Sequence, residues 1–182
     1  MTLSLSDKDG LLLLQTAREA IGARLAGRPP RFPAYPPELT VPCGAFVTLK
    51  AGGQLRGCIG HITAGQALVD AVRDVAVCSA FDDPRFPPLR AEEWPRIRIE
   101  ISVLSPFELM TDLQRIVIGV HGIMVQSGQW SGLLLPQVAT EQGWSREAFL
   151  AHGCRKAGLP ADAWRSPETR IEVFTATIFQ ES

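Results

Sequence analysis

The eight residues from Arg96 to Val103 alternate between polar and aliphatic side chains without a break. Alternation with a period of two predicts a β-strand with one apolar face, and such a strand is stable only in a larger sheet whose apolar face is covered. The positions that share the polar face are Arg96, Arg98, Glu100 and Ser102. Two interpretations of this face stay open. It is either a solvated charge ladder, in which each ion pair contributes little, or a face covered by a second lobe, where Glu100 needs a partner such as Arg56 or Arg98.

Signals for helices and hairpins surround this strand. A helix is expected from the cap Ser6 to the residues before Gly27, because Asp9 follows Ser6 at capping-box spacing and aliphatic residues recur at helical spacing. The other expected elements are a hairpin over 43–62, a helix over 64–80, strands over 116–120, 123–126 and 132–135, helices over 136–142 and 145–158, and a final strand over 170–179. Hairpins mixed with helices, without a regular β–α–β alternation, predict an α+β fold with a mostly antiparallel sheet flanked by helices.

A proline-rich segment follows the first expected helix. Six of the 14 residues from Pro29 to Pro42 are prolines. Proline fixes φ and removes a backbone donor, so this segment is expected to be a stiff, extended connector. We expect its aromatic residues Phe32 and Tyr35 to hold it against the body of the protein.

The composition excludes several classes of protein. The 182 residues fit one domain, and 46% of them are hydrophobic and 20% charged, as in an ordinary globular chain. Eighteen basic residues against 19 acidic ones give a net charge of −1, which argues against binding to nucleic acid or to an anionic membrane. No secretory signal or membrane-spanning segment is recognised, so we expect a cytoplasmic protein whose four cysteines are reduced thiols.

Motifs for the common cofactors are absent from the sequence. It contains no P-loop, no dinucleotide-binding glycine motif, and no zinc-protease or serine-hydrolase motif. Cys58 with His61 is a pair of metal-ligating side chains, as is His152 with Cys154, but neither pair has the second half of a zinc site. We therefore expect no cofactor and no metal.

The segment LRGCIGH, Leu55–His61, contains the most informative residues. A glycine within a strand costs about 0.5–1 kcal/mol relative to alanine, and strands contain such glycines where they bulge or where another backbone or a ligand approaches closely. Gly57 and Gly60 are therefore candidate binding residues. Alternation places Arg56 and Cys58 on one face, and a fixed guanidinium favours the thiolate form of a nearby cysteine. Cys58 is thus a candidate nucleophile; the alternative is a small buried hydrophobic side chain.

Two further groups of polar residues are candidates. Asp83 and Arg85 lie in the loop DPRFPPL, whose prolines can present polar groups rigidly to a site. Alternatively, Asp83 only caps this loop. His121, in the turn expected at His121 and Gly122, is either a general base or a histidine whose hydrogen bonds are satisfied within the turn.

Eight sequence blocks follow one another in an order typical of one family. They are GAFVTL at 44–49, LRGCIG at 55–60, DPRF at 83–86, EISVLSP at 100–106, HG at 121–122, LLLPQVA at 133–139, the segment Trp144–Leu150, and CRKAGLP at 154–160. The set resembles the AMMECR domain family, whose bacterial and archaeal members are called AmmeMemoRadiSam system protein A. The resemblance covers nearly the whole chain, and the LRGCIG and EISVLSP blocks together make it highly specific.

This resemblance implies a single domain over residues 1–182, made of two interleaved lobes that cannot be separated from the sequence. It also implies a cleft between the lobes, lined by motif residues. Those residues are Arg56, Gly57, Cys58, Gly60, Asp83, Arg85, Glu100, Ser102 and His121. Cys58, Glu100 and His121 are the candidate catalytic residues, and the other six are candidate ligand-binding residues. His61 is excluded, because the position after LRGCIG varies in the family.

The family name refers to two other proteins, a Memo-type protein and a radical S-adenosylmethionine protein. The resemblance therefore implies that this protein acts with them in a modification pathway. Our first hypothesis is a ligand-binding or catalytic cleft, in which Cys58 is the nucleophile or redox group of a small-molecule or protein-modifying enzyme. In that hypothesis Arg56 stabilises the thiolate or binds an anionic substrate, and Glu100 or His121 moves protons.

The alternative hypothesis is a non-catalytic adaptor for the same two partners, in which Arg56 and Glu100 form structural ion pairs and Cys58 is packing. A role with nucleic acid is disfavoured, because the chain has neither a basic surplus nor an aromatic-basic platform. A homodimer could form through an apolar patch near Trp130 or through the proline connector.

Overall fold

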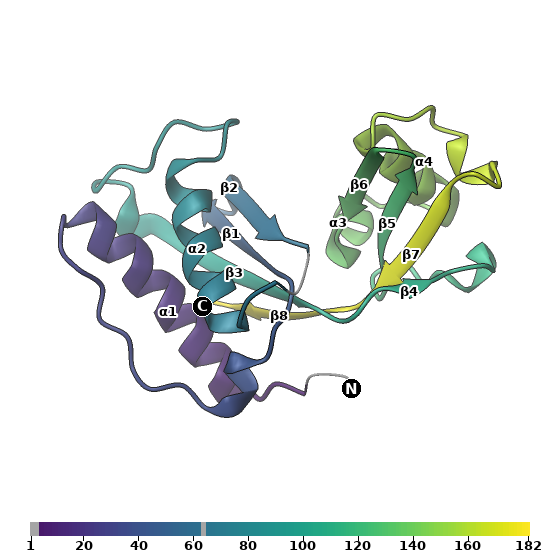
Figure 1. The fold of residues 1–182 in the computed structure, drawn as a ribbon. Helices are drawn as coiled ribbons and strands as arrows, with labels where there is room; N and C mark the ends of the chain where they lie inside the picture. Colours follow the sequence, from purple (N-terminus) through teal and green to yellow (C-terminus); the bar gives the residue numbers. More distant parts are fainter. Residues whose placement is uncertain (1–3, 63–64) are drawn as a thin grey trace. The chain divides into compact units, whose positions relative to one another are not determined.

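The computed structural model describes residues 4–62 and 65–182. Its helices are α1 (Asp7–Leu25), α2 (Leu68–Phe81), α3 (Pro136–Glu141) and α4 (Arg146–Lys156). Its strands are β1 (Ala45–Ala51), β2 (Gln54–His61), β3 (Ile97–Leu104), β4 (Glu108–Leu109), β5 (Gly122–Ser127), β6 (Trp130–Leu134), β7 (Arg170–Phe174) and β8 (Ala176–Gln180). They form two four-stranded sheets, β2-β1-β3-β8 and β4-β7-β5-β6, with antiparallel pairing (Figure 1). The predicted α+β class with mostly antiparallel sheet and flanking helices is confirmed.

The chain divides into two compact units. The first comprises Met1–Leu104 and Thr177–Ser182, and the second comprises Ser105–Ala176. Each unit contains one of the sheets and has its own apolar core. The cleft that the resemblance implies stays a prediction.

In the first unit, α1 and α2 pack on one face of the sheet. The predicted capping box starts α1: the Asp9 N–H donates to Ser6 Oγ and the Ser6 N–H donates to the Asp9 carboxylate. The alternate aliphatic residues of β3 are buried in the core with residues of both helices. Helix α2 begins at Leu68; the predicted start at residue 64 lies outside the described residues.

The proline connector is held against α2 as expected, but its residues Pro37–Thr40 form a short 3₁₀ helix and not the predicted extended chain. The Arg73 guanidinium lies 4.1 Å from the centre of the Phe32 ring and 5.2 Å from that of Tyr35. The Tyr35 hydroxyl is 2.8 Å from the Thr16 hydroxyl of α1, within hydrogen-bonding distance. Cation–π contacts and this hydrogen bond attach the connector, which has few backbone donors of its own.

Two predicted strands differ from the structure. Residues 117–121 form a turn and not a strand, because Gly119 adopts a left-handed conformation (φ +82°) and the His121 N–H donates to the Val117 carbonyl. The single strand expected over 170–179 is interrupted at Thr175, so that β7 belongs to one sheet and β8 to the other.

The end of the chain is attached to β3 by Glu181. Its carboxylate accepts hydrogen bonds from the Arg18 guanidinium and, at 2.9 Å, from the Ile99 N–H. The Glu181 N–H in turn donates to the Ile99 carbonyl. The Arg18 guanidinium also lies 4.2 Å from the centre of the Trp94 ring. Glu181 therefore connects β3, α1 and the C-terminal segment.

We expect Glu181→Gln to lower the free energy of unfolding by about 1–2 kcal/mol, because the amide cannot accept from the guanidinium and the Ile99 N–H with the same charge. Urea unfolding at pH 7 measures this. Glu38→Gln, at an exposed position, is the matched control and should leave the stability unchanged. Equal effects of the two substitutions would contradict the assigned role of Glu181.

Candidate functional site

Cys58 lies in the middle of β2, on the sheet face opposite α1 and α2. Its neighbour Gly57 faces α2, and side chains alternate along a strand. In the register of the sheet Cys58 is opposite Thr48, and Thr48 is opposite Glu100. The Thr48 hydroxyl donates a hydrogen bond to Cys58 Sγ over 3.3 Å. The partly exposed thiol thus belongs to a row of polar residues across β2, β1 and β3, which we call the Cys58 row (Cys58, Thr48 and Glu100).

An acid–guanidinium pair binds the main chain of Cys58 at the edge of the sheet. The Cys58 N–H donates to Asp83 Oδ2 over 2.9 Å, and Arg85 Nη2 donates to the Cys58 carbonyl over 3.1 Å. Asp83 and Arg85 also bond to each other, at 2.7 and 3.0 Å. Because β2 is an edge strand, this pair takes the place of a neighbouring strand. It keeps Cys58 in a defined position.

The carboxylate of this pair is buried, whereas its guanidinium is about half exposed. The Asp83 side chain is only 2% exposed. Hydrogen bonding from Arg85 lowers the Asp83 pKa to about 2, assisted by the Cys58 N–H and opposed by burial. The pKa of Arg85 is raised, chiefly by its hydrogen bonding with Asp83 and to a smaller extent by the Cys58 side chain. The structure therefore brings Asp83 and Arg85 to Cys58, and Asp83 also accepts from the Arg85 N–H within its own loop.

Arg56 occupies a different position from the one expected. The pairing shifts from Leu49 opposite Gly57 to Lys50 opposite Leu55, so Arg56 is an extra residue in a β-bulge and the alternation is interrupted. Its guanidinium donates to Glu93 at 2.8 Å and to the Pro87 carbonyl at 3.0 Å. With 12% of its side chain exposed, Arg56 is engaged in a structural ion pair. Arg85 donates to the Cys58 carbonyl, whereas the Arg56 guanidinium is engaged with Glu93 and the Pro87 carbonyl.

The two strand glycines are explained by close packing within the chain. A Cβ at Gly57 would lie 2.1 Å from the Ser79 carbonyl oxygen of α2. Ser79 Oγ also accepts from the Ile59 N–H and donates to the Val47 carbonyl, so the helix is bonded directly into the β1–β2 pair. A Cβ at Gly60 would lie 2.3 Å from the Phe46 ring. Neither glycine requires a ligand to account for it.

The polar face of β3 is covered at one end and solvated at the other. Glu100 and Ser102 are 8% and 1% exposed, whereas Arg98 is exposed. Lys50 pairs with Glu100 at 2.9 Å, whereas Arg56 and Arg98 were the example partners expected from the sequence. Thr48 and Lys50 were not among the residues predicted from the sequence. Aligning the alternating side-chain pattern of β1 with that of β3 would have identified both residues from the sequence.

His121 belongs to the second unit, unlike the other eight candidate residues. Its Nδ1 accepts a hydrogen bond from the Val117 N–H over 3.1 Å. This contact corresponds to the alternative interpretation of a histidine satisfied within its turn, and it leaves Nε2 as the proton-bearing nitrogen of the neutral ring.

The described part of the chain contains neither a cluster suited to a metal ion nor a helix suited to crossing a membrane. No three of its histidine, cysteine and acidic residues are grouped closely enough to hold a metal ion. None of its helices is both long and apolar enough to cross a membrane.

The chain is similar to archaeal proteins over its whole length. A family model described as AMMECR1 matches residues 14–179. Protein PH0010 of Pyrococcus horikoshii is 44% identical over 195 residues, covering 100% of this chain and 94% of the relative. A protein of Methanothermobacter thermautotrophicus is 44% identical over 185 residues, covering 97% and 96%. The crystal structure of uncharacterized protein PH0010 matches with a TM-score of 0.93 and 43% identity, covering 98% of this chain and 94% of that one.

Proposed function

The chain belongs to the AMMECR1 family, and from this premise we propose that the Cys58 row is a ligand-binding or catalytic site with the Cys58 thiolate as its reactive group. The observation that carries the proposal is the position of Arg85, which donates to the Cys58 carbonyl over 3.1 Å and also interacts with the Cys58 side chain. A guanidinium held in place by a buried carboxylate stabilises a neighbouring thiolate, and the thiolate is the nucleophilic form of cysteine.

Each neighbour of Cys58 has a role in this proposal. Thr48 orients the sulfur through its hydroxyl, and Asp83 holds Arg85. Glu100, whose charge is balanced by Lys50, serves as the proton acceptor for the row. A role for His121 as a second proton carrier stays part of the proposal. The ligand is a small molecule or a protein side chain with an electrophilic centre that a thiolate can attack.

The partners and the compartment are also proposed. A Memo-type protein and a radical S-adenosylmethionine protein are the proposed partners, on the strength of the family. The four cysteines are free thiols, which suits a reducing compartment, and we propose the cytosol.

Alkylation of Cys58 by iodoacetamide tests the proposal. At pH 7 we expect Cys58 to react faster than Cys78, because burial and the nearby Asp82 and Asp74 raise the pKa of the Cys78 thiol. Arg85→Gln should slow alkylation of Cys58 by about three- to tenfold by removing the positive charge beside the thiolate. Mass spectrometry of peptides reports both cysteines in one sample, so Cys78 is the internal control.

Arg98→Gln is a matched control for the loss of an arginine, since Arg98 is exposed in the same sheet. It should leave the rate at Cys58 unchanged. A Cys58 that reacts no faster than Cys78, or a rate that Arg85→Gln does not change, would remove the nucleophile from the proposal.

A non-catalytic adaptor is the second candidate function, and one observation favours it. Arg56 and Glu100 both form ion pairs inside the first unit, with Glu93 and Lys50, as expected of structural residues. Cys58→Ala separates the two functions. If the variant keeps both its cellular function and its binding to the two proposed partners, the adaptor is favoured; if binding persists and function is lost, the thiol is catalytic.

A further inference from the structure

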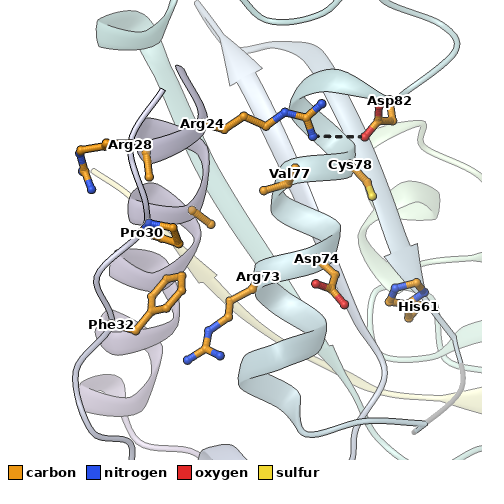
Figure 2. A pocket seen from close by; sticks show the side chains of 12 residues that line it. Arg24, Arg28, Pro30, Phe32, His61, Arg73, Asp74, Val77, Cys78 and Asp82 are labelled. Carbon is orange, nitrogen blue, oxygen red and sulfur yellow. Dashed lines mark ion pairs between the residues drawn. The ribbon is translucent and has the colours of Figure 1, made fainter. Parts of the chain in front are cut away.

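A groove distinct from the Cys58 row lies between α1, the connector and α2 in the first unit, and His61 of β2 also lines it (Figure 2). It has a volume of about 700 Å³, which is within the range of small-molecule sites. Its apolar lining comes from all three segments and consists of Ala20, Ala23, Pro30, Phe32 and Val77. The groove therefore offers an apolar body a place to bind, and its charged residues decide which ligands are accepted.

The arginines of the groove are already paired with carboxylates. The pairs are Arg24 with Asp82 at 3.8 Å, Arg28 with Glu19 at 2.6 Å and Arg73 with Asp70 at 2.7 Å. An anionic ligand would have to compete with these carboxylates for the exposed guanidinium nitrogens, since Arg73 Nε, which has no hydrogen-bond partner among the described residues, is buried. Recognition of a carboxylate or phosphate is therefore disfavoured in spite of the three arginines.

Asp74 is the acidic residue of the groove whose charge is not balanced in this way. Within residues 4–62 and 65–182, its hydrogen-bond partner is the neutral amide of Gln66, at 3.0 Å, and no ion pair includes it. Asp74, Cys78 and Asp82 lie along one side of α2 in Figure 2. Burial raises the pKa of the Cys78 thiol, and Asp82 and Asp74 raise it further against the opposing effect of Arg24. Because Asp82 is paired with Arg24, Asp74 carries the negative charge on this side of α2 that has no ion pair among the described residues.

We propose that the groove binds a small organic cation, an amine or guanidine with an apolar body. The cation pairs with the Asp74 carboxylate, and the apolar body lies along the wall that includes Val77. Pairing satisfies the unbalanced charge, while removal of apolar surface from water supplies the non-specific part of the affinity. This site does not depend on Cys58 and would stand if the proposed function of Cys58 failed.

Two probes of equal size and opposite charge, hexylammonium and hexanoate, test the proposal on the full chain. Titration followed by amide chemical shifts should show hexylammonium perturbing α2 over residues 73–82, with hexanoate binding at least fivefold more weakly. Asp74→Asn should weaken hexylammonium by about fivefold, the effect of one partly solvated ion pair. Val77→Lys, which places a fixed cation in the groove, should abolish binding of hexylammonium.

The control Asp7→Asn removes an exposed carboxylate of α1 that does not line the groove, and it should leave the affinity unchanged. Hexanoate that binds as tightly as hexylammonium would overturn the proposal. So would perturbed amides located elsewhere, or an affinity that Asp74→Asn leaves intact. Asp74 and Val77 lie outside the buried core, so substitutions there should leave the fold intact. The amide spectra verify that each variant is folded.

Discussion

Replacing Gly57 with alanine is expected to lower the free energy of unfolding by about 3 kcal/mol. The added Cβ would lie 2.1 Å from the Ser79 carbonyl oxygen, so α2 must move away from β2. That movement also strains the hydrogen bonds that Ser79 Oγ makes with Ile59 and Val47. Overpacking against a backbone cannot be relieved by a side-chain rotation, which places this substitution at the upper end of such costs. Urea unfolding at pH 7 measures the change.

Gly22→Ala is the matched control for this substitution. Gly22 lies within α1, and a Cβ there would meet the Trp94 ring nitrogen at 3.5 Å, an ordinary contact. Alanine should therefore leave the stability unchanged or raise it by up to about 1 kcal/mol, because glycine is unfavourable inside a helix. A Gly57→Ala protein as stable as the wild type would show that the contact between α2 and β2 is looser than described.

Asp83→Asn is expected to lower the free energy of unfolding by about 2–3 kcal/mol at pH 7. The buried carboxylate accepts from the Cys58 N–H, the Arg85 N–H and the Arg85 guanidinium, and an amide would direct its own donor at one of them. Release of Arg85 should also slow alkylation of Cys58, as in Arg85→Gln. Asp82→Asn is the neighbouring control; Asp82 is exposed and its ion pair spans 3.8 Å, so an effect within about 0.5 kcal/mol is expected.

The same residue gives a dependence on pH with a definite sign. The pKa of Asp83 is about 2 in the folded protein and 3.8 without perturbation. When folding lowers the pKa of a carboxyl group, that group stabilises the folded protein at pH values above its unperturbed pKa. This stabilisation is lost as the pH falls toward the pKa of the group in the folded protein. The difference in stability between the wild type and Asp83→Asn should therefore be constant above about pH 5 and shrink by about 2 kcal/mol between pH 4 and pH 2. A difference that stays constant down to pH 2 would contradict the charged role of Asp83.

The candidate site shows how far local pattern predicts contacts. Strand glycines predicted a close approach, and one exists at Gly57, but the approaching group is the helix backbone and not a ligand. Alternation predicted that Arg56 shares a face with Cys58, but the bulge at Arg56 interrupts it. The prolines around Asp83 and Arg85 predicted a loop that presents polar groups, and both residues contact Cys58. Asp83 and Arg85 contact the main chain of Cys58, whereas Arg56 pairs with Glu93; the roles assigned to all three stay predictions.

Residues close together in the chain determined the class of fold. Four local features are present in the structure, and each depends on a few neighbouring positions. They are the capping box at Ser6, the alternation of polar and aliphatic residues in β3 before Leu104, the left-handed turn at Gly52 and Gly53, and the cap at Ser145. These interactions lie within one turn or one strand, so periodicity and capping residues are enough to identify them.

Tertiary structure alone decided which groups meet. Four features follow from register and packing between distant segments. They are the pairing of Glu100 with Lys50, the Asp83–Arg85 pair on the edge of β2, the insertion of Ser79 between β1 and β2, and the division of the last strand at Thr175. One extra residue in a bulge, or one close helix contact, changes such partners without leaving a local signal. The unbalanced charge of Asp74 is of the same kind, since it depends on which distant carboxylates the arginines of the groove have already engaged.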